Sequence, residues 1–215
     1  MNHALILEYY DDLTSGGDLK RFVRHIKRRY TEGTLQRLLT HADPRSREAA
    51  LVALRLVGTM ESNAAVVACL RDEQRQLRDL AEGTLWTLWF RAESARGMDE
   101  LQGLARLIAD EQFAPALAGL TRLLRRAPRF AEAYNQRAIL HWKRKHYRRA
   151  IADCKRVLRL NPYHFGALAG MAQCYIQIDR PVESLAAFRE AYRINPNLDG
   201  VSDSIHALEQ LLRGE

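Results

Sequence analysis

The side chains best suited to metal binding or covalent catalysis are scattered along this sequence. The seven histidines are His3, His25, His41, His141, His146, His164 and His206. No two of them stand four residues apart, the spacing that would place two ring nitrogens on one helix face for a metal ion. The three cysteines form no CxxC pair, and the sequence has no glycine-rich phosphate loop or nucleophile elbow. We therefore expect no catalytic residue, no metal site and no cofactor, and a protein that is not an enzyme.

The distribution of positive charge is a clearer indication of a binding site. Residues 121–160 hold thirteen Lys or Arg against two acids, in a chain whose formal net charge is +7. The cations that we place on the outer face of a helix, or at the turn before it, are called the basic ridge: Arg144, Lys145, Arg148, Arg149, Lys155, Arg156 and Arg159. Because phosphate contacts need only charge and reach, one hypothesis is electrostatic binding of RNA or DNA by this ridge. An acidic protein and simple solvation of a helix face are the other interpretations.

The ridge belongs to a helical hairpin that the apolar pattern predicts for residues 131–164. Two amphipathic helices are joined there by a turn at residues 143–146. Neither helix can bury its apolar face alone, so the hairpin must stack on copies of itself. The copies are marked by prolines that recur every 34 residues just after a helical run, where proline cannot continue the helix. These prolines are Pro128, Pro162 and Pro196.

The 34-residue period, together with small residues such as Ala116, Ala150 and Ser184 at the same spacing, resembles the tetratricopeptide repeat family. The resemblance implies hairpins at residues 97–130, 131–164 and 165–198, followed by a capping helix at about 201–212. In that family small residues stand where the two helices of a hairpin touch. Leu104 departs from this rule in the first hairpin. The family implies a scaffold that binds other proteins.

A second repeat, with a different period, precedes these hairpins. Residues 34–54 and 65–85 superpose with an offset of 31 residues, which places Arg47 on Arg78. Asp43 followed by proline predicts a helix start in the first copy. Each arginine is expected to reach back to the turn before its helix, in a structural role. This pattern resembles the HEAT repeat family.

In tetratricopeptide arrays the first helix of each hairpin lines the concave face, so the resemblance places a partner in that groove. The projected groove residues are Asn135, Ile139, Trp142, Lys143, Gln173, Ile176 and Gln177. Apolar and amide side chains suit an extended peptide or a short helix. Some family members clamp the carboxyl-terminal peptide of a chaperone with a lysine and an asparagine at two fixed positions of one hairpin. No hairpin of this sequence carries that pair, so we do not expect this ligand.

The predicted fold is therefore an all-α solenoid of stacked antiparallel hairpins wound into a right-handed superhelix. HEAT-like repeats would occupy residues 1–96 and tetratricopeptide-like repeats residues 97–215, with the join at Ser94 to Gly97. We expect a non-catalytic adaptor that binds a protein or peptide partner, with nucleic-acid binding by the basic ridge as the alternative. Unpaired cysteines and the absence of a basic leader or a ~20-residue apolar run predict a cytoplasmic protein with no membrane span.

Overall fold

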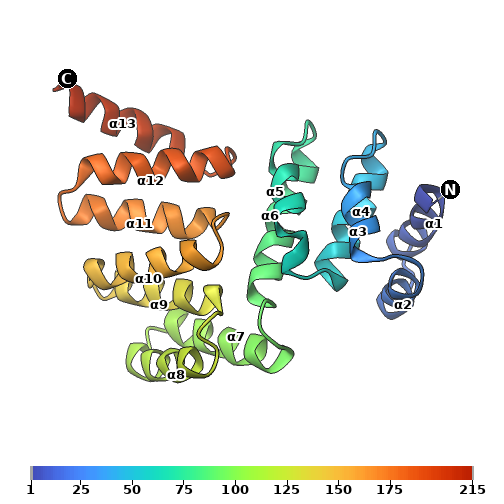
Figure 1. Cartoon of the computed structure of the whole chain (residues 1–215), viewed down its shortest axis with the longest axis horizontal. Helices are drawn as coiled ribbons and strands as arrows, with labels where there is room; N and C mark the ends of the chain where they lie inside the picture. The colour runs from blue at the N-terminus through green and yellow to red at the C-terminus, as the bar shows by residue number, and fades with distance from the viewer. Residues whose placement is uncertain (1, 215) are drawn as a thin grey trace. The chain divides into compact units, whose positions relative to one another are not determined.

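The structure is a computed structural model that describes residues 2–214, with side chains described from residue 5 onward. Within that part of the chain every regular element is helical, with thirteen α-helices, two short 3-10 helices and no strand (Figure 1). The chain divides into two compact units, Met1–Trp89 and Phe90–Glu215. The predicted all-α class is thus confirmed, and the helices of each unit pack as stacked hairpins.

The N-terminal unit follows the predicted helix starts. Its elements are α1 (Asn2–Thr14), α2 (Leu19–Arg29), α3 (Glu32–Leu38), α4 (Pro44–Val57), η1 (Met60–Ser62), α5 (Asn63–Ala68), η2 (Cys69–Arg71) and α6 (Arg75–Phe90). The Asp18 carboxylate accepts a hydrogen bond from the Lys20 N–H and caps α2. The Asp43 carboxylate accepts from two N–H groups in the first turn of α4, whose first residue is proline. Local side-chain chemistry therefore sets where these helices begin.

Two arginines 31 residues apart hold the turns of this unit in the same way. Nη1 of Arg47 donates to the backbone oxygens five and six residues before it, and Nη1 of Arg78 does the same in the next copy. Arg47 also donates from Nε and Nη2 to the Asp72 carboxylate at 2.8 and 3.1 Å, which ties one turn to the next. The structural role expected for these arginines is confirmed, and the 31-residue repeat appears in the contacts themselves.

The C-terminal unit is a continuous series of helices in which each contacts the next (Figure 1). Its elements are α7 (Ala95–Ala109), α8 (Phe113–Arg126), α9 (Ala131–Lys143), α10 (Tyr147–Leu160), α11 (Phe165–Gln177), α12 (Pro181–Ile194) and α13 (Val201–Arg213). Among the first helices of the hairpins, α9 also contacts α7 and α11. A face made of first helices therefore runs along this unit.

The three hairpin turns of the C-terminal unit repeat with a period of 34 residues. Glu111, Lys145 and Asp179 all have positive φ, at 59°, 58° and 55°. After each of them, the next backbone N–H bonds to the carbonyl oxygen five residues earlier, at 2.8 to 2.9 Å. This left-handed closure satisfies carbonyls at the end of the first helix. All three hairpins thus turn alike, although none of them uses glycine at this position.

Small residues allow the helices of each hairpin to approach closely, as predicted. Ala116, Ala150 and Ser184 are buried, and Ser184 Oγ donates to the Ala172 carbonyl oxygen across its hairpin at 3.0 Å. Leu104, the departure from the small-residue rule, is nevertheless buried in the core of the first hairpin. It is accommodated because Gly119 on α8 has no side chain, and a Cβ there would lie 2.2 Å from Leu104 Cδ2.

One helix start and one helix surface differ from the sequence-based expectation. Residues 91–94 separate α6 from α7, and Ser94 caps α7, its Oγ accepting a hydrogen bond from the Gly97 N–H at 3.0 Å. The helix therefore begins at Ala95, two residues before the predicted start of the first hairpin at residue 97. At the other end, α13 packs Val201 and Leu208 inward but leaves Leu211 exposed, so its outer face is not uniformly polar as a capping role had suggested.

Candidate functional site

Six of the seven predicted groove residues are exposed on α9 and α11. Trp142 keeps 47% of its surface exposed, Ile176 40% and Ile139 38%. Because α9 and α11 contact each other and residues 34 apart occupy equivalent positions, Trp142 lies beside Ile176 and Ile139 beside Gln173. Lys143 and Gln177 form the corresponding pair one residue further along. Together they make an exposed apolar strip with amide and ammonium groups at its border.

Asn135, the seventh predicted groove residue, is instead buried. Its Nδ2 donates to Glu132 Oε1 at 3.0 Å, and Nε2 of Gln136 donates to the same oxygen at 2.8 Å. The other carboxylate oxygen of Glu132 lies 2.9 Å from His164 Nε2. Since His164 Nδ1 accepts from the Ala167 N–H, the neutral ring carries its proton on Nε2 and donates it to Glu132. These three donors satisfy a fully buried carboxylate, so Asn135 is engaged inside the protein.

A second buried polar group joins the two helices of the same hairpin. Nε and Nη2 of Arg137 donate to the two oxygens of Asp153 at 2.8 and 2.7 Å. His141 Nε2 lies 3.9 Å from the same carboxylate. Burial, opposed by Asp153 and reinforced by nearby cations, lowers the pKa of His141 below its usual value. Sequence analysis gave no sign of either buried network, because their members are up to 32 residues apart.

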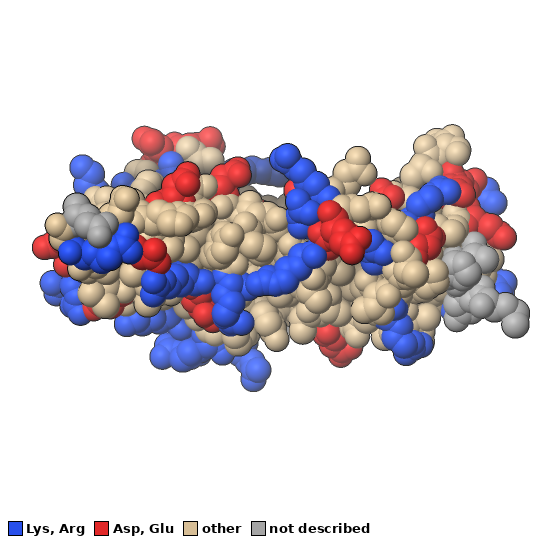
Figure 2. Space-filling model, turned by 90° about the horizontal axis from the view of Figure 1, so that it is seen from above, with Lys and Arg blue, Asp and Glu red and all other residues tan. Residues whose placement is uncertain are grey.

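The basic ridge is exposed on α10 and on the turn before it. Six of its seven members are exposed, and Arg156 is half-buried, with its guanidinium 5.7 Å from the centre of the Tyr134 ring. None of the seven makes an ion pair with a described residue. Figure 2 shows Lys and Arg gathered along the lower edge of the C-terminal unit, at the left of the view, with few acids among them.

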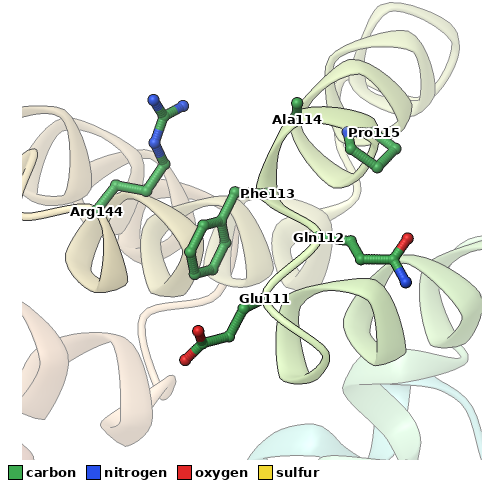
Figure 3. Close-up of a pocket in the computed structure, with 6 residues that line it drawn as sticks. All are labelled: Glu111, Gln112, Phe113, Ala114, Pro115 and Arg144. Carbon is green, nitrogen blue, oxygen red and sulfur yellow. The ribbon is translucent and has the colours of Figure 1, made fainter.

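An open hollow of about 450 Å³ lies where the α7–α8 turn meets the ridge. It is lined by Glu111, Gln112, Phe113, Ala114, Pro115 and Arg144. In Figure 3 the Phe113 ring lies between the Glu111 carboxylate and the Arg144 side chain. With one acid and one base at its border and an apolar interior, the hollow can receive a small apolar side chain. It does not gather groups for acid–base or nucleophilic chemistry.

The cysteines do not offer reactive thiols. All three are buried, and burial raises the pKa of Cys69 and Cys174 to about 11 and that of Cys154 to about 12. A thiol with so high a pKa holds almost no thiolate near neutral pH. Among the described residues, no group of three or more His, Cys, Asp or Glu is placed to hold a metal ion. The described helices also include none with the length and apolar character needed to cross a membrane.

Stacked helical hairpins with an exposed face of first helices define a helical-repeat protein. A family model for the tetratricopeptide repeat matches residues 131–164. That segment contains the hairpin of α9 and α10, its buried Glu132–His164 pair and the basic ridge. Residues 131–164 are thus a tetratricopeptide repeat, and the resemblance expected from the 34-residue period is confirmed for this hairpin.

One relative is a TPR repeat-containing protein of Rhizobium etli, 29% identical over 114 residues, or 53% of this chain and 56% of the relative. The chain therefore spans little more than half the length of that relative. Two solved structures share the fold. The first TPR domain of Spaghetti (RPAP3), bound to an HSP90 peptide, has a TM-score of 0.52 at 14% identity and covers 54% of this chain and 93% of its own. The TPR2B domain of yeast Sti1, in complex with an Hsp70 peptide, has a TM-score of 0.50 at 19% identity. That match covers 55% of this chain and 99% of the Sti1 domain.

Proposed function

We propose that this protein is a non-catalytic adaptor that binds a peptide or short helix of another protein on the exposed face of α9 and α11. The observation that carries the proposal is the pair of exposed apolar side chains, Trp142 and Ile176, at equivalent positions of neighbouring first helices. Tryptophan is a frequent anchor of protein interfaces, where a few large side chains supply most of the binding energy.

The surroundings of this pair support a peptide ligand. Gln173 and Gln177 are exposed next to it and offer both donors and acceptors to an extended backbone. The helix that carries Trp142 is anchored at its start, because Glu132 is held by three hydrogen bonds and Asn135 is one of its donors. A rigid surface loses little conformational entropy when a ligand binds.

The structural neighbours hold HSP90 or Hsp70 peptides, but we do not propose such a ligand for this chain. The two clamp positions of the second hairpin are Asn135, which is buried, and Ile139, which carries no charge. A ligand carboxylate would therefore find no lysine and asparagine pair there. The proposed partner binds through apolar contact and backbone hydrogen bonds.

The test uses the full chain and peptides selected from a random display library. Affinity of the selected peptides is measured by isothermal titration calorimetry for the wild type and for a Trp142→Ala, Gln173→Ala variant. Loss of an anchor typically costs 1–3 kcal/mol, so we expect affinity to fall about tenfold or more. Tyr192→Ala is the control, because Tyr192 on α12 is also 40% exposed. Unchanged affinity of the double variant would show that α9 and α11 are not the site.

We also propose that the hairpins of the N-terminal unit are HEAT-like and that the protein acts in the cytoplasm. Support for the first comes from the matching turn contacts of Arg47 and Arg78. The three cysteines without disulfide bonds agree with a reducing compartment. Fluorescence microscopy of a tagged full-length protein tests the location, and signal confined to another compartment would reject it.

A further inference from the structure

We infer that the basic ridge is a second binding surface, distinct from the α9–α11 face, that takes the phosphate backbone of a nucleic acid without reading its sequence. The seven cations stand on the second helix of the hairpin and on the turn before it, whereas the apolar pair stands on first helices. The inference does not depend on the peptide site.

The first observation is that the ridge is not neutralised within the protein. Four exposed arginines elsewhere in the C-terminal unit pair with acids, namely Arg126 with Glu100, Arg180 with Glu183, Arg189 with Glu209 and Arg193 with Glu190, whereas exposed arginines such as Arg122 and Arg125 carry no ion pair with a described residue. No ridge cation has such a partner among the described residues. Asp153 is the acid between Arg144 and Arg159 in the sequence, and its carboxylate is bound by Arg137 instead. Six exposed cations without an ion pair therefore face solvent over one hairpin, and the seventh, Arg156, lies half-buried over Tyr134.

The second observation is that local helix electrostatics do not explain two of the ridge positions. Arg148 and Arg149 lie in the first turn of α10, which contains no acid. Cations are disfavoured at a helix N-terminus, where the helix dipole is positive. By contrast, Lys27, Arg28 and Arg29 lie in the last turn of α2, where the dipole favours them. At these two positions the ridge holds charge that the helix dipole disfavours, whereas Arg159 lies in the last turn of α10, where the dipole favours a cation.

The third observation separates a nucleic acid from an acidic protein. No large hydrophobic side chain is exposed among the described residues between Arg144 and Arg159. Protein interfaces usually centre on a desolvated apolar or aromatic anchor, whereas phosphate contacts need only cations that reach them. Five of the seven ridge residues are arginines, whose guanidinium groups can bind phosphate in bidentate fashion. The ridge therefore fits a phosphate backbone better than a protein surface.

The absence of exposed rings on the ridge predicts how binding will behave. Tyr134, the aromatic residue beside it, is covered by the guanidinium groups of Arg137 and Arg156, at 5.4 and 5.7 Å from the ring centre. Between Arg144 and Arg159 no exposed aromatic ring offers bases a surface to stack on, and the exposed Trp142 and Tyr163 lie outside that segment, so sequence should matter little. Seven phosphate contacts would make log K fall with log salt at a slope of about −6 on duplex DNA.

The test measures fluorescence anisotropy of a labelled 20-base-pair DNA duplex and a 20-nucleotide RNA, each in two unrelated sequences, from 50 to 200 mM salt. The ridge variant replaces Arg148, Arg149, Lys155 and Arg159 by glutamine and leaves Arg156 on its tyrosine. The control variant replaces the paired Arg126, Arg180, Arg189 and Arg193 by glutamine, so both variants lose four charges from one unit. Circular dichroism checks that both remain folded.

We expect the salt slope of the ridge variant to be less steep by about 3.6 on the duplex and about 2.8 on the single strand. Its affinity at 100 mM salt should fall on the order of 10³-fold. The control should retain most of the binding, and the two sequences should bind alike. Equal losses in both variants would show that net charge alone is responsible and would overturn the inference. So would the absence of binding at 50 mM salt or a strong preference for one sequence.

A 20-residue poly-glutamate peptide tests whether the ridge binds an acidic protein instead of a nucleic acid. If it binds as tightly as the duplex, and with the same dependence on Arg148 and Arg149, the surface belongs to an acidic protein and the nucleic-acid assignment is wrong. A further variant, Arg148→Glu with Arg149→Glu, changes the charge by the same amount as the ridge variant, so it should weaken duplex binding about as much, and it should raise the melting temperature, because acids suit the first turn of α10. A lower melting temperature would show that these arginines serve folding.

Discussion

Gly119 on α8 and Leu104 on α7 offer a quantitative test of how the first hairpin packs. A methyl group at Gly119 would lie 2.2 Å from Leu104 Cδ2, well inside the ~3.5–4.0 Å at which carbon atoms pack. Moving Leu104 within the core costs about 1–3 kcal/mol, the usual range for overpacking. Alanine is favoured over glycine in a helix by about 1 kcal/mol. Gly119→Ala should therefore lower the free energy of unfolding by up to about 2 kcal/mol.

The contribution of the clash is isolated by glycines that face open space. An added methyl group at Gly103 on α7 or Gly170 on α11 meets no atom within 4 Å, so alanine at either position should stabilise the protein by about 1 kcal/mol. Gly119→Ala should give the same gain in a Leu104→Ala background, because the clashing methyl group is then gone. The coupling energy between the two sites should be about 1–3 kcal/mol, measured by urea unfolding followed by circular dichroism.

One result would refute this reasoning. If Gly119→Ala stabilises the wild type as much as Gly170→Ala does, Leu104 does not need the space that glycine leaves. The explanation for a large residue at a position where the family has small ones would then be wrong, and the first hairpin would have to pack in another way.

Three further predictions concern the second hairpin. Lys145→Gly should raise the free energy of unfolding by about 0.5–1 kcal/mol, because the φ of 58° at this turn suits glycine; a loss in urea unfolding would contradict it. Glu132→Ala should lower it by about 3 kcal/mol or more, since three buried donors lose their acceptor; a loss under 1 kcal/mol would mean that water replaces the carboxylate. The lowered pKa of His141 means that the unfolded chain binds a proton more readily, so this residue makes stability fall as pH drops below about 6.5. His141→Phe should flatten that part of a urea-unfolding profile from pH 8 to 5, and an unchanged profile would exclude the effect.

Features that depend on neighbouring residues could be predicted from the sequence. The caps at Asp18 and Asp43 involve groups two or three residues apart, and the prolines of the 34-residue repeat each mark the end of a helix. The all-α class and the tetratricopeptide hairpins follow from these signals. The exposure of Trp142 and Ile176 also agrees with their position in the repeat.

Features that depend on tertiary contacts could not be predicted from the sequence. Glu132 stands at a position that usually faces a partner, and it is buried because His164, 32 residues later, supplies a donor. Asn135 is buried with it because its Nδ2 donates a hydrogen bond to the Glu132 carboxylate. The left-handed turns at Glu111 and Lys145 lack the glycine that would have announced them. Their common position in the repeat was the available signal.

The buried Glu132–His164 pair also has a consequence for movement. His164 immediately precedes α11, so the pair holds the beginning of α9 against the beginning of α11 at a fixed spacing. The equivalent positions one repeat later are Gly166 and Leu198, which cannot form this bond. We therefore expect the spacing between α11 and α13 to change when ligands of different width bind, while the spacing between α9 and α11 stays fixed.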